Sequence, residues 1–192
     1  FWVLGAVFWE SSFKFRLSSQ NPAPSTQNLK RKMAQTIFLM GFMGSGKSAV
    51  ARTLARRLRW PILDLDALIE EEIGCYISRF FAERGEAEFR RIESEVLAQI
   101  AAQKGVVSLG GGVPTQPQNR EILKKAAKNG ATVVYLRASP EILASRIRRQ
   151  PGKRPLIDGD GELDWPATLA RVEELLAHRE PLYRECANCV VD

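Results

Sequence analysis

The chain has 192 residues, of which 45% are hydrophobic and 26% are charged, and these proportions are ordinary for a soluble globular protein. Its net charge is +6, but residues 1–32 hold five basic residues and one acidic residue, which leaves only +2 for the remainder. A nearly neutral body argues against a dedicated nucleic-acid-binding domain. Three cysteines do not suggest a disulfide framework and favour a reducing compartment.

Residues 1–32 differ in composition from the rest of the chain. They open with FWVLGAVFW, which is too short to span a bilayer because a spanning helix needs about 20 residues. A stretch rich in Ser, Asn, Gln, Pro and basic residues follows and predicts disorder. Two origins stay open, namely sequence upstream of a natural start at Met33 and an organelle transit peptide. We therefore take 33–192 as the folded domain, and expect a cytoplasmic location, or a plastid if residues 1–32 are a transit peptide.

From residue 36 onward, short apolar runs alternate with helical patterns. The apolar runs predict buried strands at 36–40, 61–66, 106–109, 132–136 and the CVVD end. Helices are predicted at 47–59, at 67–104 in pieces divided by Gly74 and Gly85, and at 119–128, 139–150 and 167–179. In the first helix, the spacing of Val50, Leu54 and Leu58 predicts the buried face. The alternation implies a parallel sheet with helices on both faces, whose ligands bind at the carboxyl ends of the strands.

The segment Gly41–Ser48 matches G-x-x-x-x-G-K-[ST] between a predicted strand and a predicted helix. Backbone N–H groups of such a loop form a concave nest for phosphate, and glycines keep side chains out of it. In this context Lys47 would contact the β- and γ-phosphates, and Ser48 would ligate Mg²⁺. The alternative, a glycine turn with an incidental lysine, does not account for the complete motif. The motif predicts a bound nucleoside triphosphate without saying what is done with it.

Further candidate residues follow the other predicted strands. Asp64 and Asp66 lie two apart, so on a strand both side chains would point the same way, one toward Mg²⁺ and one toward an acceptor hydroxyl. Gly110–Gly112 predict close approach of a ligand to the backbone. Solvated turn aspartates and a flexible glycine loop are the alternatives. The loop 150–166, rich in glycine and proline, predicts a functional lid or disorder, and a lid would bring Arg154 over the phosphates.

Taken together, these segments resemble the shikimate kinases over residues 33–192. The resemblance rests on GFMGSGKS, DLDALIE, SRFFAERGEAEFRRIE, LGGGV, KRPL and HREPLY, in that order. It implies an α/β fold of the P-loop kinase type, a three-layer α/β/α sandwich with a five-stranded parallel sheet, a substrate-binding helical region and a mobile lid. It also implies an ATP-dependent phosphotransferase that phosphorylates the 3-hydroxyl of shikimate on the route to chorismate and the aromatic amino acids.

The resemblance also implies roles for individual residues. Lys47, Asp66 and Arg154 would be catalytic, with Asp66 as the candidate base. ATP would contact Gly44, Ser45, Gly46, Lys47, Ser48, Ala49, Arg146 and Arg154. Shikimate would contact Asp66, Arg90, Gly110, Gly111, Gly112 and Arg179, and Mg²⁺ would contact Ser48 and Asp64. Arginine suits the shikimate carboxylate because its planar fork donates two parallel hydrogen bonds. From the residues alone, however, Arg90 and Glu93 at i and i+3 also fit an ordinary surface pair.

One departure and two rival functions complete the sequence-based prediction. The family continues past its last strand into an adenine-contacting loop and a closing helix, so we expect a C-terminal truncation with that helix missing and weaker ATP binding. The rivals are a kinase for another hydroxy acid, such as gluconate, and a catalytically silent regulatory domain of the same fold. The expected partners are ATP and shikimate, with no nucleic acid, no membrane and a monomeric chain.

Overall fold

A computed structural model of the protein describes residues 36–149 and 164–192. The chain divides into two units, residues 1–32 and Met33–Asp192, and every element below belongs to the second. The predicted leader and most of the predicted lid, including Arg154, lie outside the described residues.

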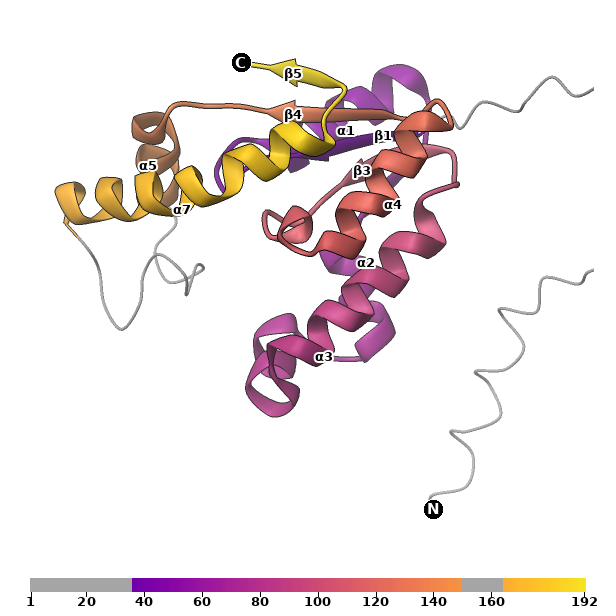
Figure 1. The fold of residues 1–192 in the computed structure, drawn as a ribbon, viewed down its shortest axis with the longest axis horizontal. Coiled ribbons are helices and arrows are strands. Elements are labelled where there is room, and N and C mark those ends of the chain that lie inside the picture. The colour runs from indigo at the N-terminus through magenta and orange to yellow at the C-terminus, as the bar shows by residue number, and fades with distance from the viewer. Residues whose placement is uncertain (1–35, 150–163) are drawn as a thin grey trace, which may run out of the picture. The chain divides into compact units, whose positions relative to one another are not determined.

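The second unit is built on a five-stranded sheet of parallel strands (Figure 1). In spatial order the strands are β2 (Ile62–Asp64), β3 (Gly105–Ser108), β1 (Thr36–Met40), β4 (Thr132–Leu136) and β5 (Cys189–Val191). At the centre, Phe38 of β1 lies between Val107 of β3 and Val133 of β4. The predicted strand–helix alternation and the five-stranded parallel sheet are confirmed.

Helices connect successive strands, as parallel pairing requires. They are α1 (Lys47–Leu58), α2 (Leu65–Ile73), α3 (Ile77–Ile100), the short 3₁₀ turn η1 (Val113–Thr115), α4 (Pro117–Lys128), α5 (Pro140–Arg148) and α7 (Trp165–Cys186). Local sequence explains several boundaries. The Ser139 side chain caps α5 with Pro140 in the first turn, and Gly74 ends α2. Gly85 interrupts α3 with non-helical backbone, as its predicted role as a divider required.

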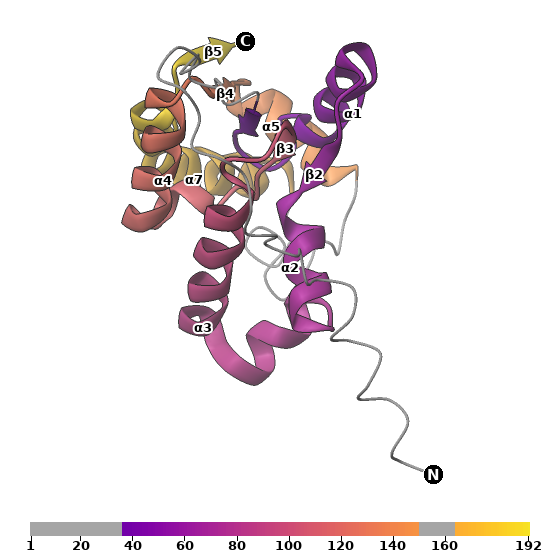
Figure 2. The same ribbon diagram turned by 90° about the vertical axis from the view of Figure 1, so that its right-hand side faces the viewer.

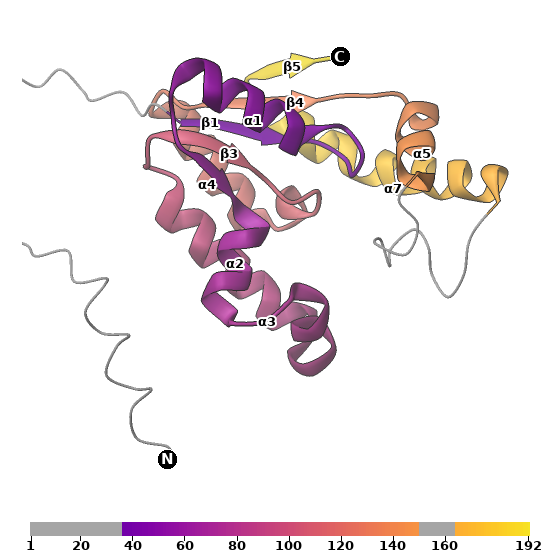
Figure 3. The ribbon, with the colours of Figure 1, turned by 180° about the vertical axis from the view of Figure 1, so that it is seen from behind.

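Two apolar clusters cover the two faces of the sheet. On one face Leu39, Val106 and Val134 pack with Ala51 and Ala55 of α1. On the other face, Phe38, Val107 and Tyr135 belong to a larger cluster that includes residues of α3, α4, α5 and α7. Neighbouring residues along a strand thus join opposite clusters, as the two-residue period of a strand dictates. Figures 1, 2 and 3 show α1 on one side of the sheet and α4 with α7 on the other, which confirms the three-layer arrangement.

Two sequence-based expectations need correction. The buried face of α1 is formed by Ala51 and Ala55. Of the predicted stripe only Leu54 packs against the same cluster, whereas Val50 and Leu58 are 40% and 38% exposed. The small alanines let the helix lie close to the sheet, and this contact outweighs the more apolar stripe. The last helix was expected to end at Arg179, but α7 runs on through Pro181 to Cys186. Because α7 lies before β5, it is the predicted helix 167–179 at greater length, and not the closing helix that the family has after its last strand.

Candidate active site

The carboxyl ends of three neighbouring strands bring the predicted site residues to one edge of the sheet. Ser108 of β3 is in register with both Leu39 of β1 and Asp64 of β2. The loop after β1, the start of α2 and the glycines after β3 therefore begin side by side. This is the edge at which parallel α/β sheets bind their ligands.

The loop after β1 has the backbone of a phosphate cradle. Gly44 and Gly46 have φ values of 81° and 95°, a region that other residues rarely adopt. A Cβ atom added at Gly41 would lie 2.5 Å from the Leu136 carbonyl oxygen, so only glycine fits between β1 and β4. Among the described residues, no side chain caps α1 and its first turn holds no acidic residue. The helix therefore presents its N–H groups and positive dipole end to the loop.

Cationic side chains gather at this loop from two helices. Lys47 Nζ donates to the carbonyl oxygens of Gly41 and Phe42 at 3.0 and 2.9 Å, which holds the ammonium group on the loop side of α1. Arg146 of α5 donates from Nη1 to the Gly44 carbonyl oxygen at 3.1 Å. A hollow of about 390 Å³ lies here, lined by Gly44, Gly46, Lys47, Ser48, Ala49, Arg146 and Arg149. Six of these seven residues were predicted to contact ATP, and Arg149 was not singled out from the sequence.

The two aspartates hold different positions from those expected of a strand end. Asp64 ends β2 and caps α2, accepting a hydrogen bond from the Ala67 N–H at 3.4 Å. Asp66 lies in the first turn of α2, so the predicted strand does not reach it. The two carboxylates are nevertheless close enough to interact, and Asp66 also senses the charge of Lys47. The capping turn brings them together, not the alternation along a strand that the sequence suggested.

Asp66 is a carboxylate of this edge whose pKa is shifted by several neighbouring groups. The residue is exposed at the surface, and desolvation by the protein atoms around its carboxyl group is the main cause that raises its pKa. The charges of Asp64 and Glu70 add to the effect, and Lys47 and Arg90 oppose it. Its Oδ1 lies against Gly110, because a Cβ atom added there would come within 2.8 Å of that oxygen. Asp66 therefore connects the lysine of the phosphate loop with the glycines after β3. A carboxyl with a raised pKa in such a position is a candidate general base.

Arg90 of α3 is held by two carboxylates. Its Nη1 donates to both oxygens of Glu93 at 3.0 and 3.1 Å, and its Nε and Nη2 donate to Glu86 Oε1 at 3.2 and 3.1 Å. The Glu93 side chain is only 2% exposed, so the pair is not the surface pair that its spacing allowed. Burial raises the pKa of Glu93 while Arg90 lowers it. The guanidinium also lies against Gly112, where a Cβ atom would come within 3.0 Å of Nη2.

Arg179 reaches the same edge from α7. Its guanidinium carbon lies 5.8 Å from the centre of the Phe42 ring, and Phe42 belongs to the phosphate loop. One turn further along α7, Tyr183 Oη donates to the Gly111 carbonyl oxygen at 2.6 Å. Burial raises the pKa of Tyr183, so its hydroxyl stays a donor. Arg90 and Arg179 thus contact the same short region, the triple glycine and the phosphate loop beside it.

Sequence reasoning did not single out several residues of this arrangement. Phe42 and Tyr183 lie within the motifs GFMGSGKS and HREPLY, but neither was given a role of its own. Asn119, which donates a hydrogen bond to Glu93, was not predicted as a site residue. The Arg90–Glu93 spacing was visible, but a spacing of three cannot show that the glutamate is buried. Arg154, the one predicted site residue outside the described residues, stays a prediction.

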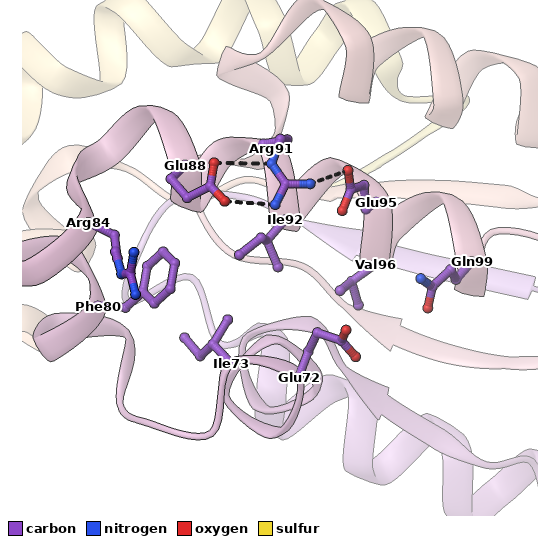
Figure 4. Close-up of a pocket in the computed structure, with 10 residues that line it drawn as sticks. All are labelled: Glu72, Ile73, Phe80, Arg84, Glu88, Arg91, Ile92, Glu95, Val96 and Gln99. Atoms are coloured by element: carbon purple, nitrogen blue, oxygen red, sulfur yellow. Dashed lines mark hydrogen bonds and ion pairs between the residues drawn. The ribbon is translucent and has the colours of Figure 1, made fainter. Parts of the chain in front are cut away.

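A second hollow, of about 370 Å³, lies between α2 and α3 (Figure 4). Ile73, Phe80, Ile92 and Val96 form its apolar lining, and Figure 4 shows Arg91 bonded to Glu88 and Glu95 along the same helix. None of the predicted site residues that the structure describes lines it. Because the Arg91 guanidinium is already paired with Glu88 and Glu95 of the same helix, we do not assign the phosphate site to this hollow.

A phosphate loop that faces a carboxylate with a raised pKa and two arginines across one sheet edge defines a P-loop phosphotransferase of small molecules. The described helices include none that is both long and apolar enough to cross a membrane.

Comparison with known proteins identifies the family within this class. The family model for shikimate kinase matches residues 43–192. A shikimate kinase of Chlorobium chlorochromatii is 45% identical over 165 residues, which cover 84% of this chain and 84% of the relative. One from Synechococcus sp. (strain JA-3-3Ab) is 41% identical over 160 residues, with coverage of 83% and 79%. The chain belongs to the shikimate kinase family.

Solved structures show the same relationship. The shikimate kinase of Acinetobacter baumannii in complex with shikimate is 36% identical, with a TM-score of 0.72, and the match covers 82% of this chain and 83% of that one. The enzyme from Bacteroides thetaiotaomicron is 32% identical, with a TM-score of 0.73 and coverage of 82% and 85%. The fold class expected from the sequence is therefore confirmed.

Proposed function

We propose that this protein transfers the γ-phosphate of ATP to the 3-hydroxyl of shikimate. The observation that carries the proposal is the position of Asp66, which interacts with Lys47 of the phosphate loop and with Arg90, and whose Oδ1 lies against Gly110. A group there can reach both a γ-phosphate and an acceptor hydroxyl. The identity of the acceptor, shikimate, is inferred from the family to which the chain belongs.

The acceptor carboxylate is assigned to the two arginines. Arg90 and Arg179 come from different helices. Arg90 lies against Gly112, whereas Arg179 lies over the Phe42 ring, one turn before the Tyr183 that binds the Gly111 carbonyl. Two guanidinium groups can hold one carboxylate by paired hydrogen bonds, which fixes the ring relative to the phosphate. Gly110–Gly112 would then line the ring, and a side chain at Gly110 or Gly112 would crowd Asp66 or Arg90.

The transfer step follows from these positions. The acceptor oxygen attacks the γ-phosphorus, the bond from that phosphorus to the oxygen of the ADP leaving group breaks, and the hydroxyl proton passes to the Asp66 carboxylate. Lys47 meets the negative charge on the β- and γ-phosphate oxygens. Arg146 would lie against the nucleotide, beside Gly44, and Ala49 would line its pocket. Arg154 is proposed to complete the charge neutralisation, and this assignment rests on the family motif KRPL alone.

Mg²⁺ is proposed as the accompanying ion, with Ser48 and Asp64 as its protein contacts. No group of three or more His, Cys, Asp or Glu side chains suited to a metal occurs among the described residues. That fits Mg²⁺, which takes one or two protein oxygens and completes its shell with phosphates and water. When bound, the ion shields the charge of the triphosphate. Ser48 is exposed at the start of α1, where its hydroxyl is accessible to such an ion.

The proposal is tested by coupled ADP release with ATP and Mg²⁺, with and without shikimate. We expect ADP formation that depends on shikimate and is absent with gluconate at the same concentration. Equal turnover with gluconate would favour the other hydroxy-acid kinase. Binding of both ligands without turnover would favour a regulatory domain. A monomeric state, a cytoplasmic or plastid location, and the absence of nucleic-acid and membrane partners stay predictions.

A further inference from the structure

One buried amide connects the two halves of the proposed acceptor site. Asn119 lies in the first turn of α4 and is 0% exposed. Its Nδ2 donates to Glu93 Oε2 of α3 and to the Val113 carbonyl oxygen of η1, both at 3.1 Å. Glu93 is the carboxylate that holds Arg90, and Val113 directly follows the triple glycine. A single side chain thus ties the arginine to the loop that would line the ring.

The way Asn119 uses its amide indicates that both donors matter. Two acceptors of different elements face its nitrogen, which fixes the orientation of the amide group. Its Oδ1 is buried and has no hydrogen-bond partner in the part of the chain that the structure describes. A buried carbonyl oxygen without a partner is normally destabilising. The two hydrogen bonds from Nδ2 therefore offset the cost of burying Oδ1 without a partner. This is expected if the asparagine is present for its two N–H donors.

Asn119 also determines which way the Glu93 carboxylate faces. Arg90 Nη1 contacts both oxygens of that carboxylate, so a rotation of the carboxylate would turn the guanidinium with it. The bond from Asn119 to Oε2 limits this rotation. Because the same amide holds Val113, the guanidinium and the triple glycine keep a fixed spacing.

We infer that Asn119 is a positioning residue for the acceptor carboxylate, acting through Glu93 on Arg90 and through Val113 on the triple glycine. The inference rests on the proposed function, because it assumes that Arg90 holds the acceptor. Asn119 itself contacts neither substrate.

The test compares Asn119→Asp with Asn188→Asp. The first change keeps the shape of the side chain but replaces the donor that faces Glu93 with a second carboxylate oxygen. Asn188 is the control asparagine. It is more exposed than Asn119 but also makes two hydrogen bonds: its Nδ2 donates to the Ala131 carbonyl at 3.0 Å, and its Oδ1 accepts from the Val133 N–H at 2.8 Å. It lies at the amino ends of β4 and β5, away from the site edge.

We expect N119D to raise the KM for shikimate about tenfold or more while the KM for ATP changes less than about twofold, because loss of an outer partner typically weakens a bound group by 10–100-fold. N188D should leave both KM values unchanged. The Kd for shikimate, measured by calorimetry without ATP, should rise with the KM in N119D alone. A purely structural role would lower the melting temperature without separating the two substrates.

Equal effects on both KM values, or no effect on shikimate, would overturn the inference. If N119D does not fold, Asn119→Ser decides, because it keeps one donor and should raise the shikimate KM selectively but less. If the wild type binds shikimate without turning it over, the proposed function fails while the calorimetric comparison still judges Asn119. If the wild type does not bind shikimate, both fail.

Discussion

At the scale of single residues, Lys47 has the most direct role in the proposed chemistry. Its ammonium group lies on the loop side of α1, held by the Gly41 and Phe42 carbonyls. In the proposed function it would contact a phosphate held in the loop that contains Gly44 and Gly46.

Replacing Lys47 with alanine removes the positive charge that meets the transferring phosphate. We expect a loss of at least ~4 kcal/mol of transition-state stabilisation, about a thousandfold in rate. Steady-state ADP release measures it, and an unchanged melting temperature shows that the fold is intact. Near-normal turnover would contradict the assignment of the phosphate site.

The proposed role of Asp66 as general base can be tested through the pH dependence of kcat/KM. Its raised pKa places the acid limb of kcat/KM above the ordinary pKa of an aspartate, since only the ionised carboxylate accepts the proton. Glu70 contributes to that rise through its negative charge. Glu70→Gln removes the charge but keeps the oxygen that accepts the Ile77 N–H at 3.0 Å. The ionised form of Asp66 becomes easier to reach, so the acid limb should move to lower pH.

The matched control for this experiment is Glu71→Gln. Glu71 is the exposed neighbour of Glu70 and is not among the groups that shift the pKa of Asp66. Its substitution should leave the profile in place. A pH profile of kcat/KM that is the same in E70Q, E71Q and the wild type would argue against Asp66 as the base.

At the scale of elements, the buried face of α1 differs from the one that the hydrophobic pattern predicted. Periodicity predicted a face of Val50, Leu54 and Leu58. Only Leu54 of these packs on the cluster that Ala51 and Ala55 form with β1, β3 and β4. A hydrophobic stripe ranks residues by their own apolarity, and it cannot show how closely the backbone approaches a neighbour.

The close contact of α1 with the sheet predicts that larger side chains will not fit there. Ala55 is 5% exposed, so Ala55→Leu should overpack the contact and lower the free energy of unfolding by ~1–3 kcal/mol. Arg52→Leu, an equally large side chain on the exposed face, should change it by less than about 0.5 kcal/mol. Chemical denaturation measures both. A tolerated leucine at 55 would mean that this face is loosely packed.

The end of α7 gives a second prediction at this scale. Tyr183→Phe removes the bond to the Gly111 carbonyl and keeps the ring, which packs 5.1 Å from the Tyr135 ring. A partly buried carbonyl left without its donor should lower stability by about 1 kcal/mol. The shikimate KM should also rise, because α7 carries Arg179. Tyr76→Phe, on a side chain of 75% exposure, should change neither quantity.

At the scale of the whole molecule, the sequence predicted the sheet and most of the site edge. Features set by neighbouring residues in the sequence were predicted correctly, as at the glycine loop before Lys47 and at the Ser139 cap of α5. The motifs placed Asp66, Arg90 and Arg179 in one site before any coordinates. Spacing could not show that Glu93 is buried, or that the amide of Asn119 reaches across from α4, since both depend on contacts between distant segments.

The remaining errors have two different physical causes. Asp66 was placed on a strand because its spacing from Asp64 fits a period of two, whereas the Asp64 side chain starts a helix at that point. The predicted end of the last helix near Pro181 ignored packing, by which Val172, Leu176 and Tyr183 hold α7 in the core. In α2 a local cap overrode the period-of-two reading, and in α7 tertiary packing overrode the helix-breaking preference of Pro181.

The central claim is that this edge of the sheet holds a nucleotide triphosphate and shikimate so that one particular hydroxyl faces the γ-phosphate. It is tested most directly by the position of the phosphate in the product, read by phosphorus–proton correlation NMR after incubation with ATP, Mg²⁺ and shikimate. The account predicts one product, with the phosphate on the 3-hydroxyl. A phosphate on another hydroxyl, a mixture of positions, or ADP formed without any phosphorylated shikimate would contradict it.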